Sequence, residues 1–386
     1  MNQAVLEAKS TSPLPNTAGL QGLAAKLGID AVVVTSPENF VYASNVSLMS
    51  VSRLRRQAFV ILPADGEPVA LVATTERKQM GEESWIKDIR NYTEFANDPA
   101  DALADVLINI GKSRGTIGID LNYLPAATHV RLVSRLPNVN FVDTSRNVAA
   151  IRAVKQKGEI ELLEKTTKQT HRAVLDALGS SRLGETERLM ANRIADSILS
   201  NGAEEIAFLI FGSGPRSAYN HARPTDRLPL KSEIIRLDVG GKYGAWSSDF
   251  ARTYSSGEPT ELQRETYRKL WELHTSTVNM VRPGMAAEDP FFFCKEQAEK
   301  LGLNFKMVWL GHSFGIEAHE FPMIRPGEKA KLEVGMAFNI EPMVTDADGS
   351  MYHLEDLFVV TEHGPRLLTL GFPPRDIPII GQPIGA

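Results

Sequence analysis

Residues 234–254 read IIRLDVGGKYGAWSSDFARTY, and this stretch decides the fold of the second half of the chain. Two apolar, strand-like segments flank a glycine-bearing turn, which is typical of a β-hairpin. Folding the chain about Tyr243 and Gly244 places Asp238 directly opposite Asp249. Residues that face each other in antiparallel strands share one side of the sheet, with Cβ atoms about 4.5–5.5 Å apart. The hairpin therefore predicts two carboxylates side by side.

The predicted carboxylate pair needs a chemical partner. Like charges at this distance repel unless a proton or a cation lies between them. A metal ion satisfies both carboxylates, whereas the plainer alternative is that both are solvated on an exposed face. The hairpin alone leaves these two interpretations open.

The composition is that of an ordinary globular protein. The 386 residues are 43% hydrophobic and 23% charged, and the length suggests two domains. A formal net charge of -5 leaves no basic excess, so we expect a small or peptidic ligand and neither nucleic acid nor a membrane as partner. No segment approaches the roughly 20 apolar residues of a membrane helix, and the N-terminus does not resemble a signal peptide. The single cysteine, Cys294, excludes an intrachain disulfide and fits a buried apolar position, so we expect a cytoplasmic protein.

Strands and helices alternate in the first 150 residues. Apolar runs predict strands at residues 30–35, 58–62, 69–73 and 116–120. Helical periodicity covers residues 98–110 and 126–136. This alternation indicates a first α/β domain that ends near residue 150, preceded by a loosely ordered N-terminus at residues 1–15.

One basic cluster lies in an expected loop of this domain: Arg53, Arg55 and Arg56. These side chains are either simply solvated or available to recognise a carboxylate.

The rest of the chain, residues 154–386, forms the predicted second domain. Four amphipathic segments have the composition and spacing of helices: 155–178, 185–201, 260–281 and 286–301. Each pair is followed by strand material, so the order helix, helix, strand recurs and suggests an internal duplication. The proline-rich tail after Phe372 cannot continue a helix or a central strand, and we expect irregular chain there.

A second acidic hairpin is predicted near the C-terminus. The segments AFNIEPMV and YHLEDLFVV are strand-like, and TDADGSM between them reads as the loop. Folding this segment symmetrically about Asp348 brings Glu341 close to Glu355. An unpaired carboxylate in a buried strand is unfavourable, so this pair also calls for a partner.

The segment between the two hairpins, VWLGHSFGIEAHEFP, adds His312 and His319. Two acidic hairpins with imidazoles make an oxygen-rich shell in which nitrogen is the minor ligand. Such a shell suits a pair of Mn²⁺, Co²⁺, Fe²⁺ or Zn²⁺ ions.

Four segments together resemble the motifs of the creatinase, prolidase and aminopeptidase P family, the M24-type metallopeptidases with the pita-bread fold. They follow the family's order and spacing: HARPTDRLPLKSEIIRLDVGGKYGAWSSDFARTY, LGHSFGIEAHEFP, EVGMAFNIEPMV and HLEDLFVVTEHG. Residues 1–150 also resemble the family's N-terminal domain. The resemblance implies a creatinase-type α/β domain at residues 16–153 and a pita-bread α+β catalytic domain at residues 154–386.

By this resemblance, five residues are the ligands of a dinuclear metal centre: Asp238, Asp249, His312, Glu341 and Glu355. Asp249 and Glu355 correspond to bridging carboxylates, and Asp238 corresponds to a ligand of one ion only. Glu341 would also hold the attacking water and pass its proton to the leaving nitrogen.

Two further histidines, His221 and His319, match family histidines that contact the substrate and the reaction intermediate. They would donate hydrogen bonds to developing negative charge. The reaction implied is hydrolysis of an amide bond, in most relatives the peptide bond before a proline.

Three positions depart from the peptidase pattern. Ser313 replaces the glycine usual after the ligand histidine, and the resulting GHSFG resembles creatinase itself. His353 stands where peptidase members often carry arginine, two residues before the last ligand. Arg325 resembles a creatinase position that binds a substrate carboxylate, although an exposed loop arginine is the plainer interpretation.

The leading hypothesis is therefore a homodimeric, dinuclear-metal hydrolase related to Xaa-Pro dipeptidases and aminopeptidases. The three departures favour an alternative enzyme that uses the same fold on a small carboxylated non-peptide, such as ectoine, creatine or dimethylsulfoniopropionate. A third alternative is a non-catalytic binding module of the same fold.

Overall fold

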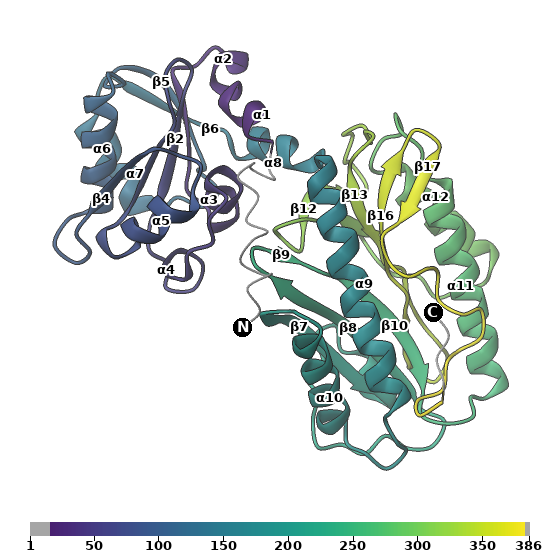
Figure 1. Cartoon of the computed structure of the whole chain (residues 1–386). Helices are drawn as coiled ribbons and strands as arrows, with labels where there is room; N and C mark the ends of the chain where they lie inside the picture. Colours follow the sequence, from purple (N-terminus) through teal and green to yellow (C-terminus); the bar gives the residue numbers. More distant parts are fainter. Residues whose placement is uncertain (1–15, 383–386) are drawn as a thin grey trace. The chain divides into compact units, whose positions relative to one another are not determined.

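The protein is described here by a computed structural model that covers residues 16–382 (Figure 1). The chain divides into two compact units between Arg152 and Ala153, next to the boundary expected from the sequence at residues 153 and 154. Both units combine helices with sheets, so the predicted mixed α/β class is confirmed. The segment expected to be loosely ordered, residues 1–15, lies outside the described residues.

The N-terminal unit is built on one six-stranded sheet with the order β4-β3-β2-β1-β5-β6. Its strands are β1 (Ala31–Val34), β2 (Phe59–Pro63), β3 (Val69–Ala73), β4 (Asp88–Tyr92), β5 (Gly115–Ile119) and β6 (Val139–Asp143). Strand β1 is central because its sequence, AVVV, is apolar on both faces and is completely buried. Strand β2 is antiparallel to both of its neighbours, and the other pairings are parallel.

Helices precede, connect and follow these strands. They are α1 (Thr17–Gln21), α2 (Leu23–Leu27), α3 (Pro37–Ser44), α4 (Met49–Ser52), η2 (Thr74–Glu76), α5 (Arg77–Glu83), α6 (Pro99–Asn109), α7 (Ala126–Arg135) and α8 (Ser145–Ala153). Leu103 of α6 and Leu132 of α7 are buried in the core beside β1 and β5. The basic cluster follows α4, where Arg56 pairs with Glu94 at 2.7 Å and its guanidinium lies over the ring of Phe95.

The first sheet of the C-terminal unit has β8 at its centre. Its strands are β7 (Glu205–Ser213), β8 (Ile234–Tyr243), β9 (Trp246–Ser247) and β10 (Phe250–Ser255). The 3₁₀ segment η3 (Gly214–Ala218) follows β7. Helices α9 (Lys157–Gly179) and α10 (Glu187–Ser200) pack on this sheet through a buried core that includes Val174, Ile194 and Leu237.

The second sheet of this unit has the order β12-β11-β13-β16-β17, with a separate two-stranded hairpin β14-β15. The strands are β11 (Gly311–Ser313), β12 (Glu320–Ile324), β13 (Ala337–Ile340), β14 (Met343–Thr345), β15 (Met351–His353), β16 (Asp356–Thr361) and β17 (Gly364–Leu367). Helices α11 (Glu261–Met280) and α12 (Asp289–Lys300) share its core through Leu270, Cys294 and Phe338. The predicted recurrence of helix, helix and strand therefore appears as α9-α10-β7 and α11-α12-β11.

The first acidic hairpin forms, but its register differs from the prediction. Asp238 pairs with Ala251, so the two-residue turn is Gly244-Ala245, one residue later than expected. Gly244 has a φ of 63°, which glycine adopts without strain at the first position of a tight hairpin turn. The predicted opposition of Asp238 and Asp249 is therefore wrong by two residues, and a slip of two residues keeps every side chain on its face.

The second acidic hairpin has the predicted register. Ile340 pairs with Asp356, and Met343 pairs with His353. Glu341 and Glu355 lie between these two pairs, at equivalent places on facing segments. The symmetric fold about Asp348 is confirmed.

The described part of the C-terminal tail, residues 372–382, is irregular as predicted, and side chains of α11 hold it through its main-chain carbonyls. Tyr267 and Trp271 of α11 donate hydrogen bonds to the carbonyls of Pro374 and Pro373. Within the described residues, no helix has the length and apolar character needed to cross a bilayer.

Candidate metal centre

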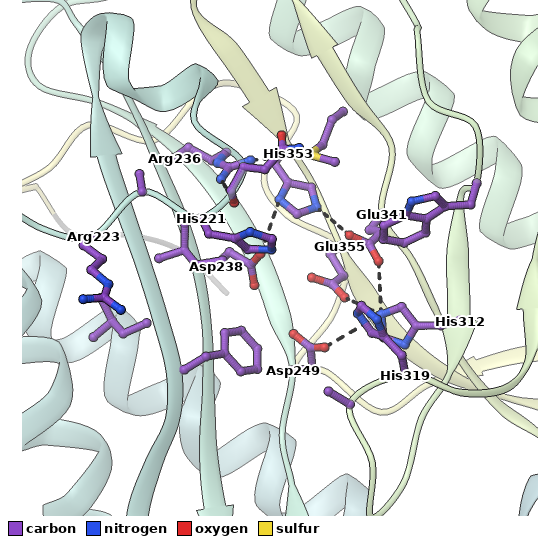
Figure 2. A pocket seen from close by; sticks show the side chains of 18 residues that line it. His221, Arg223, Arg236, Asp238, Asp249, His312, His319, Glu341, His353 and Glu355 are labelled. Atoms are coloured by element: carbon purple, nitrogen blue, oxygen red, sulfur yellow. Dashed lines mark hydrogen bonds and ion pairs between the residues drawn. The ribbon is translucent and has the colours of Figure 1, made fainter. Parts of the chain in front are cut away.

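The five residues predicted as metal ligands reach one cavity from both sheets of the C-terminal unit (Figure 2). Asp238 lies on β8, Asp249 lies directly before β10, and His312 lies on β11. Glu341 follows β13, and Glu355 precedes β16. The cavity has a volume of about 690 Å³. Its apolar lining includes Phe208, Leu209, Ile210, Trp309, Ala318 and Met343.

His312 lies among three of the carboxylates. Its Nε2 atom is 3.1 Å from Glu341, 3.9 Å from Asp249 and 3.9 Å from Glu355. Two donor atoms that each lie about 2.1 Å from a shared ion are roughly 3.0 Å apart at a right angle and about 4.2 Å apart when opposite. The separations around His312 fall within this range, so its imidazole and the carboxylates can share ions.

Burial makes this acid cluster costly without a cation. Burial, together with neighbouring carboxylates, raises the pKa of Asp249 and of Glu355 well above the usual range, and burial also raises the pKa of Asp238. For Glu341, burial acts to raise the pKa, but the imidazoles of His312 and His353 beside its two oxygens outweigh it and lower the pKa. The Oδ1 atom of Asp249 is buried with no hydrogen-bond partner among the described residues. Burial thus favours the protonated form of these three carboxyl groups, and a divalent cation would displace such protons.

The side chains form two groups that could each hold a metal ion. Asp249, His312 and Glu355 make one group, and Glu341, His353 and Glu355 make the other. In each group the ligand atoms lie within 4.8 Å of one another. Because Glu355 belongs to both groups, the arrangement can accommodate two neighbouring ions.

The two histidines expected to contact substrate also line this cavity. His319 lies after β11 with its ring centroid 4.3 Å from that of His312, and His221 lies in the loop before β8. Both side chains are exposed where they line the cavity (Figure 2). Burial and the nearby His312 lower the pKa of His319, so its imidazole is neutral and can donate one hydrogen bond. The ring of Trp309 lies 5.7 Å from that of His319.

Two protein-family models match, between them, almost all of the residues that the structure describes. Residues 161–362 match "Metallopeptidase family M24". Residues 17–154 match "Creatinase/Prolidase N-terminal domain".

The chain belongs to metallopeptidase family M24.

Several relatives cover nearly all of this M24 chain. The Xaa-Pro dipeptidase of Pyrococcus furiosus is 29% identical over 346 residues, which cover 88% of this chain and 93% of the relative. The probable dipeptidase PepE of Mycobacterium tuberculosis is 30% identical over 351 residues, which cover 88% and 90% of the two chains. These likenesses confirm the resemblance stated from the motifs.

Solved structures agree with the sequence comparison. A prolidase from Thermococcus sibiricus has a TM-score of 0.85 at 25% identity and covers 96% of this chain and 100% of its own. The prolidase from Pyrococcus furiosus has a TM-score of 0.79 at 28% identity, with coverage of 90% and 98%. The M24 chain is therefore a metallopeptidase-type enzyme, and the hypothesis of a non-catalytic binding module finds no support.

The structure does not bring Arg325 to the cavity of this M24 unit. Arg325 follows β12, is exposed, and is absent from the cavity lining. Ser313, another departure from the peptidase pattern, accepts a 3.4 Å hydrogen bond from Lys155 Nζ and is absent from the cavity lining. The two positions therefore give no support to a small non-peptide substrate.

Two charged residues beside the site were missed by sequence reasoning. Lys155 forms a buried ion pair with Glu320, the residue after His319, at 2.8 Å. Arg236 lies two residues before Asp238 on β8, lines the cavity, and donates a 2.7 Å hydrogen bond to the carbonyl of Tyr219. The period of two along a strand puts Arg236 on the same face as Asp238, and this signal could have identified it.

Proposed function

We propose that this protein is a dinuclear-metal hydrolase that cleaves the peptide bond before a proline. The observation that carries the proposal is the convergence of three buried carboxylates, the half-buried Asp238 and His312 on one cavity. The substrate class is supported by relatives named Xaa-Pro dipeptidase and by similar solved structures named prolidase.

The proposed ligands are Asp238, Asp249, His312, Glu341 and Glu355, with Asp249 and Glu355 as the bridging carboxylates. Four carboxylates carry the charge that two divalent cations would balance. The oxygen-rich donor set fits Mn²⁺, Co²⁺, Fe²⁺ or Zn²⁺. When bound, such ions lower the pKa of a water molecule and polarise the scissile carbonyl.

The chain's own groups supply the proton transfers and the orientation. Glu341 accepts a proton from the attacking water and passes it to the leaving proline nitrogen as the C–N bond breaks. His319 and His221 donate hydrogen bonds to the carbonyl oxygen as it gains negative charge. The apolar lining near Trp309 and Phe208 excludes water and offers a surface to the proline ring.

Hydrolysis of Xaa-Pro dipeptides and of longer peptides with proline at the second position tests this proposal. Protein reconstituted with Mn²⁺ or Co²⁺ should release proline or the free N-terminal residue, and Asp249→Ala should abolish this release. The matched control is Asp65→Ala, because that aspartate is 85% exposed and lies in the other unit. Failure of the metal-loaded wild type to cleave Xaa-Pro bonds at any length would refute the proposal.

We further propose that the chain forms a homodimer and acts in the cytoplasm. The dimer follows from the family resemblance, and the location is supported by the lone, buried Cys294, which fits a reducing compartment. Light scattering should give twice the 42.4 kDa chain mass. A monomeric mass would contradict the dimer.

A further inference from the structure

His353 lies inside the acid cluster, but it is not one of the five ligands that the family resemblance implies. It ends strand β15, and only 1% of its side chain is exposed. Both ring nitrogens are buried without a hydrogen-bond partner among the described residues. An imidazole buried in this way is unfavourable unless something at the site engages it.

The atoms that face His353 are carboxylate oxygens. Its Nε2 atom is 3.4 Å from Oε2 of Glu341, and its Nδ1 atom is 4.0 Å from Oδ2 of Asp238 (Figure 2). A separation of about 3.4 Å is expected for two donors at a tetrahedral angle, each about 2.1 Å from one ion. It is too long for a well-formed N–H···O hydrogen bond, whose usual distance is about 2.9 Å.

The carboxylate of Glu341 lies between the buried imidazoles of His312 and His353. Its Oε1 atom faces Nε2 of His312 at 3.1 Å, and its Oε2 atom faces Nε2 of His353 at 3.4 Å. His312 and His353 belong to separate groups of ligand atoms that share Glu355. Each of the two groups therefore contains one imidazole nitrogen.

We propose that His353 is a sixth metal ligand, which coordinates the second ion of the pair through Nε2. This inference rests on the dinuclear centre proposed above and adds a residue to it. It gives each ion one nitrogen donor, whereas the five-residue set gives a nitrogen to one ion only.

The extra imidazole has a consequence for metal preference. Imidazole suits Zn²⁺ and related late metals, whereas carboxylate oxygen suits Mn²⁺. A second nitrogen donor should raise the affinity of the second site for Zn²⁺ more than its affinity for Mn²⁺. A hydrogen bond from His353 to Glu341 would instead support both metals to a similar extent.

Chelator-competition titrations of Zn²⁺ and of Mn²⁺ into metal-free protein separate these roles. Loss of an outer hydrogen-bonding partner typically weakens metal binding on the order of 10- to 100-fold, so loss of a direct ligand should exceed about 100-fold. His353→Asn should weaken the second Zn²⁺ by more than about 100-fold and the second Mn²⁺ by a clearly smaller factor. The control is His363→Asn, which changes an exposed histidine in the turn between β16 and β17 and should leave both affinities unchanged.

The outcomes distinguish this inference from the proposed function. Equal weakening of Zn²⁺ and Mn²⁺, or no weakening, would overturn the role of His353 while two ions still bind to the wild type. A wild type that binds fewer than two ions would overturn the dinuclear centre itself. If His353→Asn does not fold, the crystal structure of Zn²⁺-loaded wild type decides: the inference requires an Nε2–Zn distance of about 2.0–2.1 Å, and an ion more than about 3 Å away would refute it.

Discussion

Replacing Lys155 by methionine removes one partner of a buried ion pair that supports the histidine-bearing loop. Lys155 Nζ lies 2.8 Å from Glu320, and the two side chains are 1% and 4% exposed. The other oxygen of Glu320 accepts hydrogen bonds from the amides of Ile316 and Glu317, at 3.0 and 3.2 Å. The pair therefore connects the start of α9 to the loop that leads to His319.

The expected loss of stability follows from the charge left behind. Removing one partner of a buried ion pair costs about 3–5 kcal/mol, because the remaining charge stays buried after losing its counter-ion. Lys155→Met should therefore lower the free energy of unfolding by that amount. In Lys155→Met/Glu320→Gln, the neutral amide oxygen can still accept the loop hydrogen bonds, so we expect a smaller loss of about 1–2 kcal/mol.

Urea unfolding of the metal-free protein, followed by tryptophan fluorescence, measures these losses. Three of the four tryptophans report on the C-terminal unit: Trp246, Trp271 and Trp309. Lys157→Met is the control, because Lys157 is 90% exposed and its 3.8 Å pair with Glu161 should contribute less than about 1 kcal/mol. The reasoning is refuted if Lys155→Met costs no more than this control, or if the double variant is less stable than Lys155→Met.

Three further outcomes are expected. Burial holds the pKa of Asp249 and of Glu355 above their unfolded values, so these two groups make the metal-free protein less stable as pH rises above about 4. Buried histidines with lowered pKa, such as His274, titrate in the opposite sense and are common to all variants. The gain in Tm of Glu355→Gln over wild type, measured with EDTA, should therefore grow from about pH 5 to about pH 8, and a constant difference would contradict the burial argument. Because the same protons must leave when ions bind, Mn²⁺ binding should release protons and tighten as pH rises, which calorimetry in buffers of different ionisation enthalpy measures; unchanged heats across buffers would count against it. Arg236→Met removes a hydrogen bond from a charged group to the Tyr219 carbonyl, beside the loop of His221, and should lower kcat about tenfold or more. In a His221→Ala background, the same substitution should cause little further loss of kcat. Fully multiplicative losses in the double variant would show that Arg236 does not act through this loop.

The sequence predicts the two acidic hairpins to different accuracy. The loop around Asp348 has one symmetric solution, and the register of Glu341 against Glu355 follows from it. In the first hairpin, glycine can occupy either central position of a tight turn, so the residues alone do not distinguish Tyr243-Gly244 from Gly244-Ala245. The site survives this error because a two-residue slip preserves the faces of the strands.

Contacts between distant segments could not be predicted in this way. Lys155 and Glu320 are 165 positions apart in the sequence, and no local sequence pattern predicts that they form an ion pair. His353 is visible in the sequence as a departure from the family, but only the folded chain brings it against Glu341 and Asp238. Arg325 is the opposite case: the motif suggested that it contacts the substrate, but its side chain is exposed and lies outside the cavity.

The number of cobalt ions retained per chain tests the central claim most directly. Metal-free protein is loaded with Co²⁺, dialysed against buffer that contains no metal, and analysed by atomic emission. Two ions per chain are expected for the wild type, and fewer than one for Glu355→Gln, because Glu355 belongs to both groups of ligand atoms. A wild type that retains no cobalt, or a Glu355→Gln variant that still retains two ions, would contradict the account.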